Sequence, residues 1–191
     1  MKITDDSLFK IFQPSINSCY ATTLHIAFRV LDIKISISSI NKLAHYNSKY
    51  AVHEPNPEAR INEELGKKYN FVIKSKNNLG VEDLKKIIVD KDSSPPILIL
   101  NIEYLNLYGN KFKVYTPLGP EDQVPQHQII LNDINEEDSE LVDTYIPFYS
   151  NPTMRNPLKI STPKLLSLWF ENSAIWIEHR TKQDNLIRHL R

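Results

Sequence analysis

Residues 13–31 read QPSINSCYATTLHIAFRVL and contain Cys19, the only cysteine in the chain. The apolar residues after Cys19 recur with the period of a helix, which predicts a helix over residues 19–31 with Ser18 as its N-cap. One face of this helix collects Ala21, Leu24, Ala27, Phe28 and Leu31. A cysteine at the start of a helix is either a nucleophile or a small buried hydrophobe, and the rest of the sequence has to decide between them.

The length and composition predict a single folded domain. The chain has 191 residues and a mass of 22.2 kDa, and its hydrophobic fraction of 41% is ordinary for a globular protein with a sizeable core. We expect one domain over residues 1–180, followed by a C-terminal tail over residues 181–191. The formal net charge is zero, so we expect neither nucleic acid nor a membrane as a partner, because both favour a basic surplus.

Cysteine and glycine usage limits the chemistry that the chain can perform. A lone cysteine excludes an internal disulfide framework and zinc sites of the CxxC type, and the phosphate-binding motifs GxGxxG and GxxxxGK[ST] are absent. The first residues, MKITDDSLFKIFQPS, lack the apolar core of a secretory signal, and no apolar stretch reaches the roughly 18 residues of a membrane span. We therefore expect a cytoplasmic protein without a cofactor or a metal.

Helical patterns dominate the first half of the chain. Apolar residues at helical spacing predict further helices over residues 36–46, 56–70 and 79–91. Strand patterns dominate the second half. An apolar run behind two prolines predicts a buried strand over residues 95–105, and alternation predicts another over residues 111–117.

The remaining residues complete an antiparallel sheet. Residues 127–133 and 140–146 predict two strands joined by a polar hairpin turn, with a short helix over residues 161–173 and a closing strand over residues 174–179 after them. Helices followed by an antiparallel sheet are typical of an α+β fold.

Four residues together have the chemistry of a thiol nucleophile. Such a site needs a lowered thiol pKa, a base, an orienting partner for the base and donors for the developing oxyanion. A helix start at Cys19 meets the first need, because the helix N-terminus favours the thiolate. His127 and Asp143 lie on neighbouring strands of the predicted hairpin, where they could meet as base and orienter. Gln13, six residues before Cys19, could donate a side-chain N–H to the oxyanion beside the Cys19 backbone N–H.

Each of these residues also has an ordinary structural interpretation. Free cysteine is among the most buried residue types, so Cys19 could simply be packed in the core. Taken alone, His127 could be a strand-edge residue, Asp143 could cap a turn and Gln13 could be a surface residue. Asn132 and Asp133 are rival orienters, although a cross-strand neighbour reaches His127 more easily than residues of the same strand.

These segments resemble the papain-like cysteine peptidases, and among them the bacteriocin-processing peptidases that cut after a double-glycine leader, together with their free-standing relatives. That family has a Gln, a Cys six residues later that begins a helix, and much later a His that opens a strand, a hairpin and an Asp. The matching segments here are QPSINSCYATTLHIAFRVL, PPILILNIEYL, QHQIILNDINEEDSELVDTYIP, TPKLLSLWFENS and AIWIEH, within roughly residues 8–180.

The resemblance implies a papain-like α+β fold, in which an N-terminal helical half packs on an antiparallel β-sheet. It also implies a cysteine peptidase acting on a peptide or protein substrate. Its residues would be Cys19 as nucleophile, His127 as base, Asp143 as orienter and Gln13 as oxyanion donor.

Two departures from the family pattern leave alternatives open. Tyr20 stands where the family usually has glycine or another small residue, and the proline that usually follows the Asp comes four residues after Asp143. The same four residues would also serve an acyltransferase or amidase. A bulky Tyr20 beside the nucleophile would instead suit an inactive papain-like module that binds peptides, and the tail segment NLIRHLR would suit a scaffold role. The sequence leaves the oligomeric state open.

Overall fold

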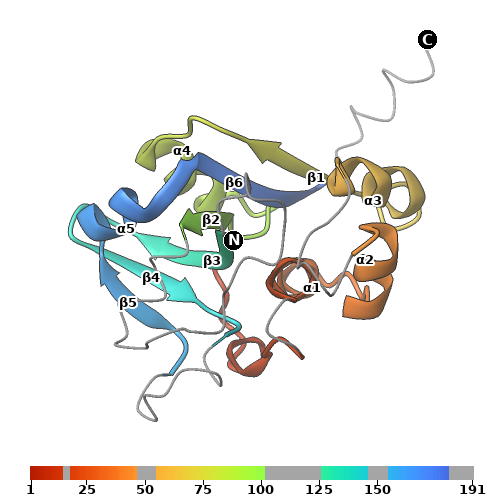
Figure 1. Ribbon diagram of the computed structural model, residues 1–191, viewed down its shortest axis with the longest axis horizontal. Coiled ribbons are helices and arrows are strands. Elements are labelled where there is room, and N and C mark those ends of the chain that lie inside the picture. Colours follow the sequence, from red (N-terminus) through yellow and green to blue (C-terminus); the bar gives the residue numbers. More distant parts are fainter. Residues whose placement is uncertain (15–17, 47–54, 102–125, 146–154, 181–191) are drawn as a thin grey trace, which may run out of the picture.

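The computed structural model describes residues 1–14, 18–46, 55–101, 126–145 and 155–180 (Figure 1). The predicted strand over residues 111–117 and the C-terminal tail over residues 181–191 lie outside the described residues. The domain boundary at residue 180 stays a prediction.

The described strands form one antiparallel sheet in the order β1-β6-β2-β3-β4-β5. Their bounds are β1 (Phe71–Lys76), β2 (Ile97–Asn101), β3 (Gln126–Ile134), β4 (Asp138–Val142), β5 (Leu158–Ser161) and β6 (Trp169–His179). The predicted hairpin is confirmed as β3 and β4, and the sheet together with the helices confirms the predicted α+β class.

The helices divide into two groups around the sheet. In Figure 1, α1, α2 and α3 gather on one side, while α4 and α5 lie on the other. The described helices are η1 (Leu8–Lys10), α1 (Cys19–Val30), α2 (Ile37–Leu43), α3 (Pro57–Leu65), α4 (Val81–Val89) and α5 (Thr162–Leu168). The predicted apolar face of α1 is buried in full, with Ala21, Leu24, Ala27, Phe28 and Leu31 all at 5% exposure or less.

Two apolar cores explain why β3 is apolar on both faces. Ile130 packs in the core that contains α1, whereas its neighbours Ile129 and Leu131 pack in the core that contains α4 and α5. Side chains alternate along a strand, so a strand covered on both faces needs apolar residues at nearly every position. This packing sets the start of α1 against the β3–β4 hairpin, which carries the candidate site.

No strand is predicted over residues 71–76, where the structure has β1, and the predicted helix over residues 56–70 ends earlier than expected. That helix, α3, ends at Leu65, and Gly66 follows it as the C-cap. A Cβ at Gly66 would lie 2.4 Å from the carbonyl oxygen of Asn62 and 2.9 Å from that of Phe71, so only glycine lets the chain turn this tightly into β1. The turn closes with the Phe71 N–H donating to the Gly66 carbonyl over 2.9 Å.

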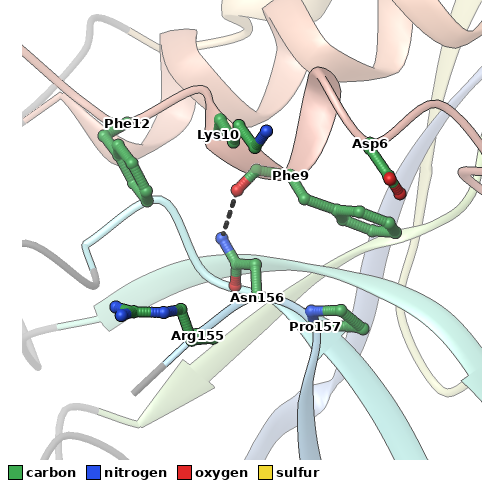
Figure 2. A pocket seen from close by; sticks show the side chains of 7 residues that line it. All are labelled: Asp6, Phe9, Lys10, Phe12, Arg155, Asn156 and Pro157. Carbon is green, nitrogen blue, oxygen red and sulfur yellow. Dashed lines mark hydrogen bonds between the residues drawn. The ribbon is translucent and has the colours of Figure 1, made fainter. Parts of the chain in front are cut away.

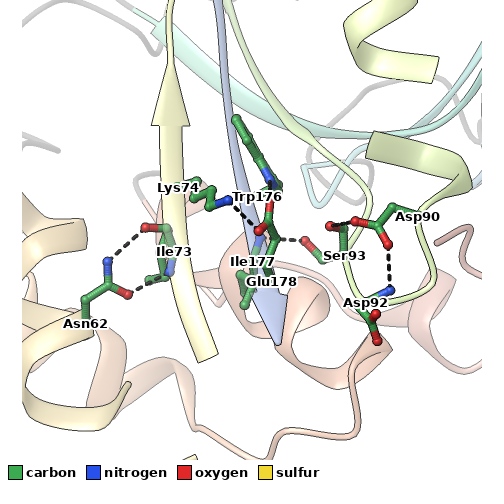
Figure 3. Close-up of polar contacts among 10 residues, drawn as sticks. Asn62, Ile73, Lys74, Asp90, Asp92, Ser93, Trp176, Ile177 and Glu178 are labelled. Atoms are coloured by element: carbon green, nitrogen blue, oxygen red, sulfur yellow. Dashed lines mark hydrogen bonds and ion pairs between the residues drawn. The ribbon is translucent and has the colours of Figure 1, made fainter. Parts of the chain in front are cut away.

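Polar side chains secure β1 at the edge of the sheet (Figure 3). The amide of Asn62 on α3 donates to the Ile73 carbonyl over 2.8 Å and accepts from the Ile73 N–H over 2.6 Å. Lys74 pairs with Glu178 across the strands over 2.5 Å, and Glu178 also accepts from the Trp176 indole over 2.7 Å. Pairing the edge backbone with a side chain protects it from association with another strand.

The predicted helix over residues 161–173 is wrong in its second half. The helix α5 ends at Leu168, and Trp169–Ser173 belong to β6. Leu98 lies opposite Ala174 while Leu100 lies opposite Trp169, so β6 carries a bulge here, and Glu171 and Asn172 adopt positive φ angles of 49° and 48°. Pairing with β2 overrides the local helical pattern, as tertiary context commonly does.

The other differences concern short elements and strand ends. The short elements η1 and β5 were not predicted from the sequence. The strand predicted over residues 95–105 is β2, described as Ile97–Asn101, and residues 102–105 lie outside the described residues. The second hairpin strand ends at Val142, so Asp143 follows the strand directly. Within the described part of the chain, no helix has the length and apolarity of a membrane span. The cytoplasmic location stays a prediction.

Candidate active site

Cys19 is the first residue of α1, as predicted, and its side chain is half-buried. Ser18 precedes it as the N-cap residue. The first N–H groups of a helix have no acceptor within the helix, and the helix dipole is positive at this end. Both features stabilise an anion, so the fold places the thiol where its thiolate form is favoured.

The β3–β4 hairpin brings His127 and Asp143 together. His127 is the second residue of β3, and Asp143 follows the last residue of β4. The Nε2 atom of His127 lies 2.9 Å from Oδ1 of Asp143, and both residues are 0% exposed. A buried imidazole and carboxylate at hydrogen-bonding distance interact far more strongly than an exposed pair.

Two further contacts fix this pair. The backbone N–H of Tyr145 donates to the same Oδ1 atom of Asp143 over 2.8 Å. The ring of Tyr145 packs edge-on against the His127 imidazole, with the ring centres 5.9 Å apart. The carboxylate therefore has a fixed orientation, and an aromatic ring covers one side of the imidazole.

The ionisation of Cys19 and His127 is coupled. Burial alone would raise the pKa of the Cys19 thiol, but the hydrogen bond and charge of His127 and the backbone N–H groups of Gln128 and Tyr20 lower it below its ordinary value of 9.0. Burial alone would lower the pKa of His127, but the charge and hydrogen bond of Asp143, aided by Cys19, raise it to about 10. These opposite shifts favour a thiolate–imidazolium pair.

The rival orienters Asn132 and Asp133 serve the N-terminal segment instead. Asn132 accepts a hydrogen bond from the backbone N–H of Ile3 over 2.6 Å and donates to Glu140 over 2.6 Å. Asp133 pairs with Lys2 over 2.5 Å. Of the three polar residues weighed from the sequence, Asp143 is the one that the structure places against the imidazole.

Gln13 is buried beside the residue that follows Asp143. Its backbone N–H donates to the carbonyl of Thr144 over 3.0 Å. Its side-chain oxygen Oε1 accepts a hydrogen bond from the Thr144 hydroxyl over 2.9 Å. Gln13 is 3% exposed and Thr144 is 0% exposed, so neither side chain is an ordinary surface residue.

Asn156, which the sequence did not single out, holds the backbone at Asp143. Its Oδ1 accepts from the Asp143 N–H over 2.9 Å, and its Nδ2 donates to the Asp143 carbonyl over 3.0 Å. The same Nδ2 donates to the Phe9 carbonyl over 3.1 Å, as Figure 2 shows. No local pattern marks this asparagine, since its partners are backbone groups far away in the sequence.

A hollow of about 350 Å³ lies beside Asn156 (Figure 2). Phe12, which precedes Gln13, is 39% exposed and lines it. The segment over residues 6–12 and the segment over residues 155–157 form its two walls, and the lining residues are Asp6, Phe9, Lys10, Phe12, Arg155, Asn156 and Pro157. Within the described residues, no group of three or more His, Cys, Asp and Glu side chains could hold a metal ion.

Comparison with known proteins finds similarity in structure but not in sequence. No protein-family model matches the chain, and no curated protein matches it in a sequence search. A protein from Bacillus anthracis assigned as a C39-like peptidase has 16% identity and a TM-score of 0.58, over 90% of this chain and 94% of that one.

Two transporter-associated peptidases have the same fold. A double-glycine motif protease from an AMS/PCAT transporter, solved with its leader peptide, has 12% identity and a TM-score of 0.53, over 88% of this chain and 89% of that one. The peptidase domain of Streptococcus ComA, a bifunctional ABC transporter of quorum sensing, has 13% identity and a TM-score of 0.51, over 89% of this chain and 97% of that one. The chain therefore has the papain-like fold of the C39 peptidase domains, as the resemblance predicted.

Proposed function

We propose that the chain is a cysteine peptidase that hydrolyses a peptide bond through Cys19, His127 and Asp143, with Gln13 as an oxyanion donor. One observation carries this proposal: the buried His127–Asp143 pair lies beside a thiol at a helix N-terminus, with the pKa of Cys19 lowered and that of His127 raised. The C39 peptidase fold supports it, because the structures with this fold include a double-glycine motif protease and the peptidase domain of an ABC transporter.

The proposed mechanism gives each nitrogen of the His127 ring a role. Asp143 holds Nε2, so Nδ1 is the nitrogen that exchanges a proton with the thiol. The Cys19 thiolate attacks the peptide carbonyl carbon, and the oxygen that becomes negative is bound by the Gln13 side chain and the Cys19 backbone N–H. The imidazolium then protonates the leaving amine as the C–N bond breaks. Water, deprotonated by the neutral imidazole, hydrolyses the resulting thioester and frees the thiol.

The hollow between residues 6–12 and 155–157 is a candidate site for substrate residues beside the scissile bond. Phe12, one of the lining residues of the hollow, directly precedes the proposed oxyanion donor Gln13 in the sequence. Phe9, Phe12 and Pro157 offer apolar surface. Its charged lining comprises two basic residues, Lys10 and Arg155, and one acidic residue, Asp6, which favours a peptide with an apolar and an acidic side chain.

A cleavage assay tests the proposed activity. The full chain and its Cys19→Ser variant would each be incubated with a mixture of synthetic peptides, including peptides with two adjacent glycines, and products would be identified by mass spectrometry. We expect products with new termini from the wild type alone. A folded wild-type chain that cleaves no peptide and forms no thioester would contradict the proposal.

The same assay separates hydrolysis from acyl transfer. Adding glycinamide offers an amine that competes with water for the thioester. Hydrolysis gives a free carboxylate at the new C-terminus, whereas transfer gives a product longer by one glycinamide. We expect the free carboxylate to dominate at millimolar glycinamide.

A further inference from the structure

Gln13 and Thr144 are joined by two hydrogen bonds of different kinds. The Gln13 backbone N–H donates to the Thr144 carbonyl, and the Thr144 hydroxyl donates to Gln13 Oε1 over 2.9 Å. The first bond fixes where the Gln13 backbone lies. The second holds the oxygen end of the side-chain amide, so the nitrogen end, Nε2, points away from Thr144.

A glutamine amide has an oxygen that only accepts and a nitrogen that only donates. An oxyanion needs donors, so a Gln side chain helps it only when Nε2 points to the reacting carbonyl. In the observed arrangement the Thr144 hydroxyl donates to Oε1, so Nε2 is the end of the amide that would donate to the reacting carbonyl. Thr144 is 0% exposed, so bulk solvent does not reach its hydroxyl.

We propose that Thr144 is a positioning residue that holds the Gln13 amide with its N–H groups toward the oxyanion. This inference rests on the proposed function, which supplies the role of Gln13. Thr144 directly follows Asp143, so a single turn of the chain carries both the partner of the base and the residue that aligns the oxyanion donor.

Asn156 fixes this turn through the backbone of Asp143. It accepts from the Asp143 N–H and donates to the Asp143 carbonyl, while it also holds the Phe9 carbonyl. Phe9 lies four residues before Gln13, so one amide joins the segment of the oxyanion donor to the turn that aligns it. The Asn156 hydrogen bonds therefore hold the turn that carries Thr144 and the segment that leads to Gln13 against each other.

Two reactions of Cys19 separate alignment of the oxyanion donor from activation of the thiol. p-Nitrophenyl acetate acylates the thiolate through a tetrahedral oxyanion: an S–C bond forms, the C–O bond breaks and p-nitrophenolate leaves. Iodoacetamide alkylates the thiolate by direct displacement of iodide, and no oxyanion forms. A residue that only aligns Gln13 affects the first reaction and leaves the second unchanged.

The variants are Thr144→Val, which keeps the shape without the hydroxyl, and Thr144→Ser, which keeps the hydroxyl. Loss of one oxyanion donor costs about 10²-fold or more in rate, so we expect Thr144→Val to slow acylation at least about 10-fold. We expect Thr144→Ser to stay within about 3-fold of the wild type. The rate of alkylation and its pH dependence should be the same in all three proteins.

The double variant Gln13→Ala/Thr144→Val provides the second criterion. If Thr144 acts through Gln13, the double variant acylates no more slowly than Gln13→Ala alone. Equal acylation by Thr144→Val and the wild type would overturn the inference, as would equal losses of acylation and alkylation. A wild type that is alkylated at low pH but never acylated would also overturn it. The proposed function itself fails by a different result, namely alkylation that does not depend on His127.

Discussion

The hydroxyl of Tyr20 donates a hydrogen bond to Oε1 of Glu58 over 2.9 Å. Tyr20 is 3% exposed and belongs to the apolar core beneath α1, and Glu58 lies in the first turn of α3. The ring beside the nucleophile is thus anchored between two helices. The sequence offered this bulky residue as the main support for an inactive binding module, and the observed packing removes that support.

Replacing Tyr20 with Phe should therefore affect stability and leave thiol chemistry unchanged. Removing the hydroxyl breaks one hydrogen bond to a half-exposed carboxylate that water can partly resolvate, so we expect a loss of about 1 kcal/mol in the free energy of unfolding. Urea denaturation would measure this loss, and iodoacetamide would measure the reactivity of Cys19. A Tyr20→Phe variant with altered Cys19 reactivity would place the ring in the site after all.

Asp143→Asn should weaken the activation of Cys19. The carboxylate charge is the main influence that raises the pKa of His127, so its removal disfavours the imidazolium and the thiolate beside it. We expect the pH of half-maximal alkylation to move upward and acylation near pH 6.5 to fall at least about 10-fold. Asp133→Asn is the matched control, because Asp133 pairs with Lys2, and it should behave as the wild type.

The ion pair also predicts an unusual pH dependence of stability. Folding lowers the pKa of Cys19 below its ordinary 9.0 and raises that of His127 from 6.5 to about 10. Between the lowered pKa of Cys19 and pH 9.0, folding releases one proton at Cys19 and binds one at His127, so the two contributions to the pH dependence of stability cancel. Above pH 9.0 the unfolded chain loses its proton while folded His127 keeps one up to about pH 10, so stability falls in that window.

Cys19→Ser isolates the histidine contribution. Without a titrating thiol, the stability from the raised pKa of His127 is complete below pH 6.5 and decreases as the pH rises toward the folded-state pKa. Chemical denaturation at several pH values would show a decline in the stability of Cys19→Ser that begins near pH 6.5, and a smaller decline in the wild type up to about pH 9. Parallel curves for the two proteins would contradict the ion pair.

Phe12→Ala tests the hollow as a substrate site. We expect KM for cleaved peptides to rise about 10-fold with a smaller change in kcat, because the ring would contact substrate residues away from the reacting bond. Leu166→Ala is the matched control, since Leu166 is exposed to a similar degree, 37% against 39%, but lies on α5. Equal effects of the two substitutions would exclude a specific role for the hollow.

The sequence predicted those parts of the site that depend on local pattern and on neighbouring strands. The helix start at Cys19 follows from apolar spacing, and the His127–Asp143 pair follows from a hairpin whose strands and polar turn are contiguous in the chain. Short-range structure of this kind is encoded by periodicity and turn residues.

The residues that hold the site in position, Thr144 and Asn156, could not be predicted in the same way. Thr144 and Asn156 act on Gln13, Asp143 and Phe9 through contacts between distant segments, and no spacing rule connects those segments. The first residues of β6 were predicted as helix for a related reason. Trp169 and its neighbours have an apolar pattern that suits a helix, and only pairing with β2 makes them a strand.

The most direct test of the central claim is the pH dependence of Cys19 alkylation by iodoacetamide in the wild type and in His127→Gln. The chain has one cysteine, so every alkylated molecule reports on Cys19. Circular dichroism would show that the variant is folded. We expect half-maximal reaction of the wild type well below pH 9.0, and a shift to pH 9.0 or above when His127 is replaced. The same half-maximal pH in both folded proteins would contradict a Cys19–His127 pair and, with it, the proposed peptidase.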